Sequence, residues 1–237
     1  MSAMVERDEI AANIERVRER ISRAAKRAGR HGDEVTLVAV SKTFPAEAIR
    51  AAYDAGLRHF GENRVQEWES KQRLVADLDA TWHLIGHLQS NKALRAAYLF
   101  RRVDSIDDLA LAKRLAAAAA AEGKNLPVLI EVHLGDEATK SGVAVTDLPA
   151  LAQGIAPFAH IDLVGLMTIP PLADDPELAR PYFRKLRELR DDVSRRVGRK
   201  MPVLSMGMSH DFEVAIEEGA TEIRLGTALF GERQPKP

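Results

Sequence analysis

Lys42 is the residue whose type and position most readily suggest chemistry in this 237-residue chain. It ends the run VTLVAVSK (residues 35–42), in which apolar residues follow one another almost without alternation. A strand without a polar face is typical of a parallel sheet covered by helices on both sides. A lysine at the end of such a strand is costly to bury as an ammonium, so it is a candidate for a tuned amine that attacks a carbonyl to form a Schiff base. The alternative is a lysine that extends to solvent.

Two later segments have residue types that suit a phosphate group. Ser209 ends GMS and is expected at the N-cap of a helix over residues 210–218, where free N–H groups and the helix dipole favour an anion. In LGT, Gly226 allows close backbone approach and Thr227 offers a hydroxyl. The alternatives are a plain N-cap for Ser209 and a plain turn for Gly226.

The elements that position these residues alternate regularly along the chain. Branched apolar segments, each followed by a helical pattern, predict eight strands at residues 35–41, 59–63, 81–86, 102–104, 126–133, 161–167, 203–205 and 222–225. Before them, a stripe of apolar residues predicts a helix over residues 5–29.

Eight strand–helix units in a chain of this length predict an α/β fold, a single (β/α)8 TIM barrel over residues 1–237. Residues 1–32 then form an N-terminal helix that packs on the barrel. The alternative is an open doubly wound sheet, which usually has a glycine-rich loop after its first strand, whereas SKTFPAE follows here.

In a barrel, the ends of strands seven and eight often bind phosphate. A lysine across the barrel mouth from such a phosphate site suggests a phosphorylated aldehyde, of which pyridoxal 5′-phosphate (PLP) is the common one. Arg224 precedes LGT, and an arginine beside the pyridine nitrogen would keep that nitrogen unprotonated because its guanidinium stays charged. The alternative for Arg224 is a structural ion pair, for instance with Glu222.

Composition excludes several classes of protein. The net charge of −1 gives no basic field for nucleic acid or an anionic membrane. The chain has no cysteine, which excludes disulfides, thiolate catalysis and cysteine-bound metals, and no metal site is predicted. The N-terminus lacks the apolar core of a signal peptide, and the longest apolar run in a helical context, residues 115–121, is too short to span a bilayer. We expect a cytoplasmic protein.

Seven segments together resemble the pyridoxal phosphate homeostasis protein family over nearly the whole chain. They are LVAVSKTFPAEAI, FGENRVQE, WHLIGHLQSNK, ATKSGV, LVGLMTIP, LSMGMSHDFEVAI and RLGTALFG. The family looks like the barrel of alanine racemase without its β-domain. The resemblance implies a protein of intracellular PLP (vitamin B6) homeostasis.

The resemblance also implies roles for six residues in PLP binding. Lys42 is the Schiff-base lysine, Arg224 faces the pyridine nitrogen, Asn63 sits beside the cofactor, and Ser209, Gly226 and Thr227 hold the phosphate. The chain departs from the family pattern at His87, where proline is usual, and at His133, where asparagine is common. Both histidines are predicted at the barrel mouth, either as solvated loop residues or as titrating groups near the cofactor.

Racemases of this fold need a second acid/base, a tyrosine from the β-domain of a partner subunit. We expect no β-domain after the eighth unit, and none of the tyrosines, at positions 53, 98 and 182, falls at a predicted strand end. We therefore expect a monomeric PLP binder without catalytic residues, with PLP-requiring apo-enzymes as further partners. Two alternatives stay open: a PLP-dependent amino-acid racemase or decarboxylase, and a phosphate-binding barrel enzyme in which Lys42 is a free base.

Overall fold

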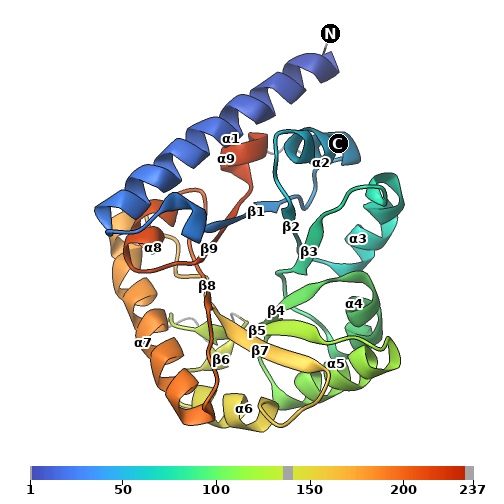
Figure 1. Cartoon of the computed structure of the whole chain (residues 1–237), viewed down its shortest axis with the longest axis vertical. Coiled ribbons are helices and arrows are strands. Elements are labelled where there is room, and N and C mark those ends of the chain that lie inside the picture. Colours follow the sequence, from blue (N-terminus) through green and yellow to red (C-terminus); the bar gives the residue numbers. More distant parts are fainter. Residues whose placement is uncertain (1, 136–140, 233–237) are drawn as a thin grey trace.

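The protein forms a closed barrel of eight parallel strands surrounded by helices (Figure 1). This computed structural model describes residues 2–135 and 141–232. Around the barrel the strands follow the order β4-β3-β2-β1-β9-β8-β7-β5, and the pairing of β4 with β5 closes it. The predicted (β/α)8 fold is confirmed.

The strands of the barrel agree with the predicted ones to within two residues at either end. They are β1 (Thr36–Val40), β2 (His59–Glu62), β3 (Thr81–Leu84), β4 (Arg102–Ile106), β5 (Leu126–His133), β7 (Ile161–Met167), β8 (Val203–Ser205) and β9 (Glu222–Leu225). A further strand, β6 (Val143–Ala144), pairs with the end of β5. This strand was not predicted. The family segment ATKSGV, residues 138–143, lies partly outside the described residues, which omit 136–140.

Helices follow the strands around the outside. The α-helices are α1 (Ser2–Arg27), α2 (Ala46–Asp54), α3 (Val65–Lys71), α4 (Ala93–Leu99), α5 (Leu109–Ala121), α6 (Leu148–Ile155), α7 (Arg180–Val197), α8 (Phe212–Glu217) and α9 (Thr227–Phe230). Short 3-10 turns are η1 (Gly32–Glu34), η2 (Gln72–Val75), η3 (Ser90–Lys92) and η4 (Pro176–Ala179). Within the described part of the chain, no helix has both the length and the apolar character needed to cross a membrane.

The N-terminal helix α1 lies along the outside of the barrel beside α2, α8 and α9 (Figure 1). Its apolar stripe, Ile10, Ile14, Val17 and Ile21, is buried as its spacing predicts. Full burial of such side chains stabilises the fold by roughly 2 kcal/mol each. Polar contacts add to this packing, since Asn13 donates to the carbonyl of Leu229 at 3.0 Å. Helix α1 thus holds together the first and last units of the barrel.

Candidate functional site

The six residues predicted to bind a cofactor lie at one end of the barrel, on four strands that are neighbours in the sheet. They are Lys42 after β1, Asn63 after β2, Ser209 after β8, and Arg224, Gly226 and Thr227 at the end of β9. Because the strand order there is β2-β1-β9-β8, all six share one sector of the carboxyl-terminal mouth. This is the end of a (β/α)8 barrel at which active sites occur.

Lys42 is half-buried in the turn that follows β1. The register of β1 and β9 pairs Val38 with Arg224, and a Cβ atom built on Gly226 would lie 3.5 Å from the carbonyl oxygen of Val40. Lys42 therefore lies beside the segment that begins at Gly226. The expectation of a lysine across the mouth from the phosphate segments was wrong, because closure of the barrel pairs the first strand with the last.

Ser209 is not the N-cap of the following helix, which corrects a second expectation. Helix α8 begins at Phe212, with Asp211 at its N-cap. Asp211 accepts a hydrogen bond from the backbone N–H of Met208 at 2.7 Å, and this keeps the preceding residues in a turn. The hydroxyl of Ser209 instead accepts from the N–H of Ala228 at 3.2 Å. The two predicted phosphate segments, after β8 and after β9, are thus in direct contact.

Gly207 shapes the loop that carries Ser209. Its φ is +96°, a left-handed conformation that favours glycine, and a Cβ atom there would lie 2.7 Å from that of Ala215 on α8. Its carbonyl accepts from the N–H of Arg224 at 3.0 Å. Only a residue without a side chain lets this loop pack on α8 and pair with the end of β9.

Arg224 is buried in the barrel, with 4% of its surface exposed. Its Nη1 donates to the hydroxyl of Ser205 at 2.7 Å and its Nη2 to the carbonyl of Thr168 at 2.9 Å. Burial lowers the pKa of Arg224, and the charge of Glu222 opposes that change. The predicted alternative was a direct ion pair between Arg224 and Glu222. The two residues are instead linked through Ser205, whose hydroxyl accepts from Arg224 and donates to Glu222 at 2.7 Å. The guanidinium is therefore fixed at one side of the site.

Behind Arg224, the barrel interior holds a cluster of charges instead of the apolar layers that usually fill such barrels. Arg102 donates to Asp104 at 2.6 and 2.8 Å and to Glu222 at 2.6 Å. Burial would raise the pKa of Asp104, but the Arg102 guanidinium and His83 hold it well below its ordinary value. His83, Asp104 and Glu222 could offer ligand atoms to a metal, yet Arg102 already supplies the positive charge between the two carboxylates.

Glu131 is an interior acid that the sequence analysis did not select. It pairs in register with Met167, which pairs with Ser205, so the three side chains point to the same side of the sheet, into the barrel. Burial raises the pKa of Glu131 to about 7, although the nearby Arg224 favours the charged form. The available signal was a charged residue in the otherwise apolar strand LPVLIEVH.

Glu62 and Lys71 are a second group that the sequence analysis missed. The Nζ atom of Lys71 lies 2.8 Å from Oε1 of Glu62, and both side chains are buried. They lie next to the turn that carries Lys42, since Lys71 also donates to the carbonyl of Ser41 at 2.8 Å. Glu62, at the end of a buried strand in FGEN, was the available signal.

The two histidines that depart from the family pattern have different environments. His87 is an exposed loop residue whose Nδ1 lies 3.3 Å from Asp107. His133 is half-buried at the end of β5, and its Nε2 is buried without a hydrogen-bond partner among the described residues. The interpretation as a solvated loop residue is therefore correct for His87 and wrong for His133.

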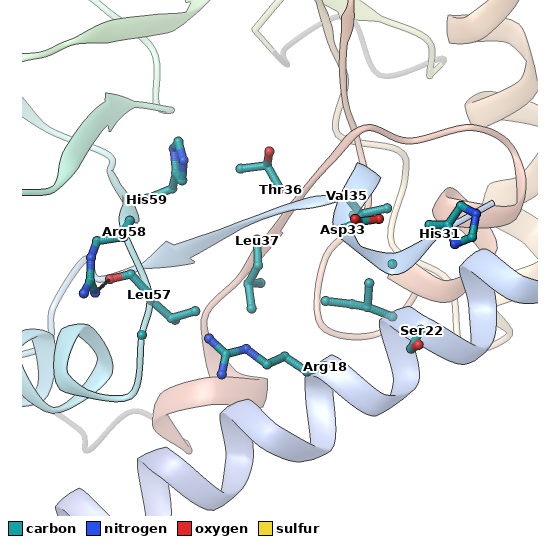
Figure 2. A pocket seen from close by; sticks show the side chains of 13 residues that line it. Arg18, Ser22, His31, Asp33, Val35, Thr36, Leu37, Leu57, Arg58 and His59 are labelled. Carbon is teal, nitrogen blue, oxygen red and sulfur yellow. Dashed lines mark hydrogen bonds between the residues drawn. The ribbon is translucent and has the colours of Figure 1, made fainter.

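Two of the cavities lined by described residues lie at opposite ends of the barrel. One of about 530 Å³ opens at the mouth beside Asn63 and His87. Gly86 belongs to its lining, and a Cβ atom there would lie 2.4 Å from the carbonyl oxygen of Asn63. The other, of about 590 Å³, lies between α1 and the start of β1, where Figure 2 shows Arg18 and Arg58. None of the six predicted residues lines this second cavity. The candidate site is therefore the mouth at the carboxyl-terminal ends of the strands.

The donor set of the mouth fits the cofactor that the sequence predicts. Lys42 supplies an amine for an aldehyde, and Ser209 and Thr227 supply hydroxyls for a phosphate. Arg224 supplies a guanidinium that two hydrogen bonds hold from behind. One sector of the mouth therefore holds an amine, two hydroxyls and a guanidinium, the groups that the sequence analysis assigned to the aldehyde, the phosphate and the ring nitrogen of PLP.

Comparison with known proteins identifies the family to which the chain is related. The model of the alanine racemase N-terminal domain matches residues 5–234. The pyridoxal phosphate homeostasis protein of Aquifex aeolicus is 49% identical over 224 residues, which cover 93% of this chain and 97% of that protein. The protein of the same name from Escherichia coli K12 is 44% identical over 234 residues, covering 95% and 97%.

Solved structures give the same result. PipY of Synechococcus elongatus, solved with PLP bound, has a TM-score of 0.84 and 39% identity over 94% of this chain and 100% of its own. Alanine racemase from Corynebacterium glutamicum shares the fold, with a TM-score of 0.70 and 20% identity over 95% of this chain and 62% of that enzyme. The chain belongs to the pyridoxal phosphate homeostasis protein family, built on the fold of the alanine racemase N-terminal domain.

Proposed function

We propose that this protein binds PLP covalently through Lys42 and takes part in intracellular PLP homeostasis without catalytic turnover. The observation that supports this most strongly is the meeting of six residues at the ends of four adjacent strands. One of them is a buried arginine that the barrel interior holds in place. The family relationship supports the same assignment, because the related PipY was solved with PLP bound.

Each residue has a defined task in this proposal. Lys42 would hold PLP through its amine, and PLP would supply the aldehyde for a Schiff base. Arg224 would lie toward the ring nitrogen, where its permanent charge disfavours protonation of that nitrogen and so weakens the ring as an electron sink. Ser209, Gly226 and Thr227 would hold the phosphate, and Asn63 would contact the cofactor from the neighbouring strand.

A storage or delivery role fits the positions of the tyrosines. Tyr53, Tyr98 and Tyr182 lie on α2, α4 and α7, outside the barrel. None is at the mouth, where a racemase needs its second acid/base. The apo-enzymes that require PLP are the expected recipients, and the protein acts as a monomer in the cytoplasm in this proposal.

One observation favours the alternative, a PLP-dependent racemase or decarboxylase. Glu131 points into the barrel at the end of β5, and its pKa is raised to about 7 by burial. A carboxyl group with such a pKa is suited to proton transfer near neutral pH. Multiple turnover of an amino acid by the PLP-loaded protein, lost in Glu131→Gln, would establish this alternative in place of the carrier.

The test is a titration of the protein with PLP followed by visible absorbance, borohydride reduction and mass mapping of the modified lysine. We expect one modified residue, Lys42, and loss of the absorbance in Lys42→Ala. Lys92→Ala is the matched control, since Lys92 lines the mouth cavity without being assigned to PLP. Modification elsewhere, or unchanged absorbance in Lys42→Ala, would contradict the proposal.

A further inference from the structure

The turn that carries Lys42 has an unusual backbone. Thr43 has a φ of +68°, in the left-handed region that residues other than glycine avoid. This conformation is strained. One hydrogen bond within the turn, from the N–H of Phe44 to the carbonyl of Ser41 at 3.1 Å, offsets part of that strain. Other contacts must therefore fix the turn in one conformation.

Lys71 supplies several of these contacts from the end of α3. Its Nζ donates to the carbonyls of Ser41 at 2.8 Å and Phe44 at 3.4 Å, the first and last residues of the turn. Only 8% of Lys71 is exposed. A buried ammonium is stable when it is paired, and Nζ lies 2.8 Å from Oε1 of Glu62 and 3.3 Å from Oε1 of Glu67.

The two acids also bind the turn directly. The hydroxyl of Ser41 donates to Oε1 of Glu62 at 2.7 Å, and the N–H of Thr43 donates to Oε1 of Glu67 at 2.5 Å. Burial raises the pKa of Glu62, and the adjacent Lys71 opposes that change. The residues on both sides of Lys42 are thus held by side chains of β2 and α3.

We propose that Lys71, held by Glu62, is a positioning residue for covalent attachment at Lys42. Two hydrogen bonds from its ammonium tie the two ends of the Ser41–Phe44 turn to α3, which fixes the backbone from which the Lys42 amine projects. A reacting group held in place reacts faster than a mobile one, and a displacement of about 1 Å costs on the order of a hundredfold in rate. The inference rests on the proposed attachment of PLP to Lys42.

The test compares rates of covalent attachment in four variants. Lys71→Met removes the donors but leaves Glu62 buried without its cation, so Lys71→Met/Glu62→Gln is made as well to remove that charge. Lys71→Arg keeps a cation and its donors. Lys124→Met is the matched control, because Lys124 also donates to a backbone carbonyl, that of Phe100 at the C-cap of α4 at 3.0 Å, but at the other end of the barrel.

Each folded variant is mixed with PLP, and samples are reduced with borohydride over time to count modified Lys42. We expect attachment about tenfold slower or more in Lys71→Met and in Lys71→Met/Glu62→Gln. Lys71→Arg should recover most of the rate, and Lys124→Met should keep it even if it is less stable. Wild-type rates in a folded Lys71→Met/Glu62→Gln protein would overturn the inference while leaving the proposed function intact. Absence of a trapped adduct in the wild-type protein would overturn both.

Discussion

The guanidinium of Arg102 meets the carboxylate of Glu222 inside the barrel, with Nη2 2.6 Å from Oε1. Glu222 also accepts from Ser205, and Ser205 accepts from Arg224. Arg224, at the candidate site, is therefore the outer end of a hydrogen-bonded series that begins with Arg102 on β4. The position of its guanidinium thus depends in part on a residue outside the six predicted ones.

Replacement of Arg102 by methionine should destabilise the protein by about 3–5 kcal/mol, because it leaves Asp104 and Glu222 buried without their cation. Urea unfolding measures the loss. Arg50→Met is the control. The ion pair of Arg50 with Asp77 is exposed, so its loss should change the free energy of unfolding only slightly. Equal losses in the two variants would contradict the assignment of Arg102 as the central charge of the interior.

Glu131 should make stability fall as the pH rises from about 4.5 to about 7. The folded protein keeps a proton on Glu131 because burial raises the pKa of this carboxyl to about 7 from the ordinary 4.5. The unfolded chain releases that proton at lower pH. The free energy of unfolding therefore falls by about 3 kcal/mol as the pH rises across this window. Glu131→Gln should lack this loss. The check is urea unfolding of the PLP-free protein at several pH values, and parallel curves for the two proteins would show that Glu131 titrates normally.

Ser209→Ala should weaken the retention of PLP while attachment at Lys42 still occurs. The change removes the hydroxyl assigned to the phosphate and its contact with the N–H of Ala228. Loss of one such hydrogen bond to a charged group is worth about 1.5–3 kcal/mol, or roughly 10- to 100-fold in affinity. Equilibrium dialysis gives the affinity and borohydride mapping gives the site. Ser194→Ala, on the far end of α7, is the control, and an unchanged affinity in Ser209→Ala would argue against the phosphate assignment.

Gly207→Ala should cost about 3 kcal/mol of stability and weaken PLP binding, because Gly207 has both a left-handed backbone and a close neighbour. Its φ is +96°, and the added methyl would lie 2.7 Å from that of Ala215. Gly198→Ala separates the two effects, since Gly198 has a φ of +65° but nothing within 4 Å. That control should lose only about 1 kcal/mol and leave PLP binding unchanged. Equal losses would mean that the loop moves to accommodate the methyl.

The strand–helix alternation was sufficient to predict the barrel. Period and composition are local properties, so the apolar run before Lys42 and the stripe of α1 specified their own secondary structure and buried faces. The same local reasoning failed at Ser209, because the helix begins at Phe212 and the Ser209 hydroxyl instead contacts Ala228, from the segment after β9. The type of each element could be predicted from the chain, whereas the exact start of this helix could not.

The sequence by itself determined the fold class, the end of the barrel at which chemistry is expected, and six candidate residues at strand ends. Only the tertiary structure decided that Lys42 lies beside the phosphate segments, since that follows from the pairing of the first strand with the last. It also decided the partners of the interior charges. Arg102 and Glu222 are 120 positions apart, and no pattern of local period relates them. Their contact exists because closure of the barrel points both side chains into one interior of low polarity, where each charge needs the other.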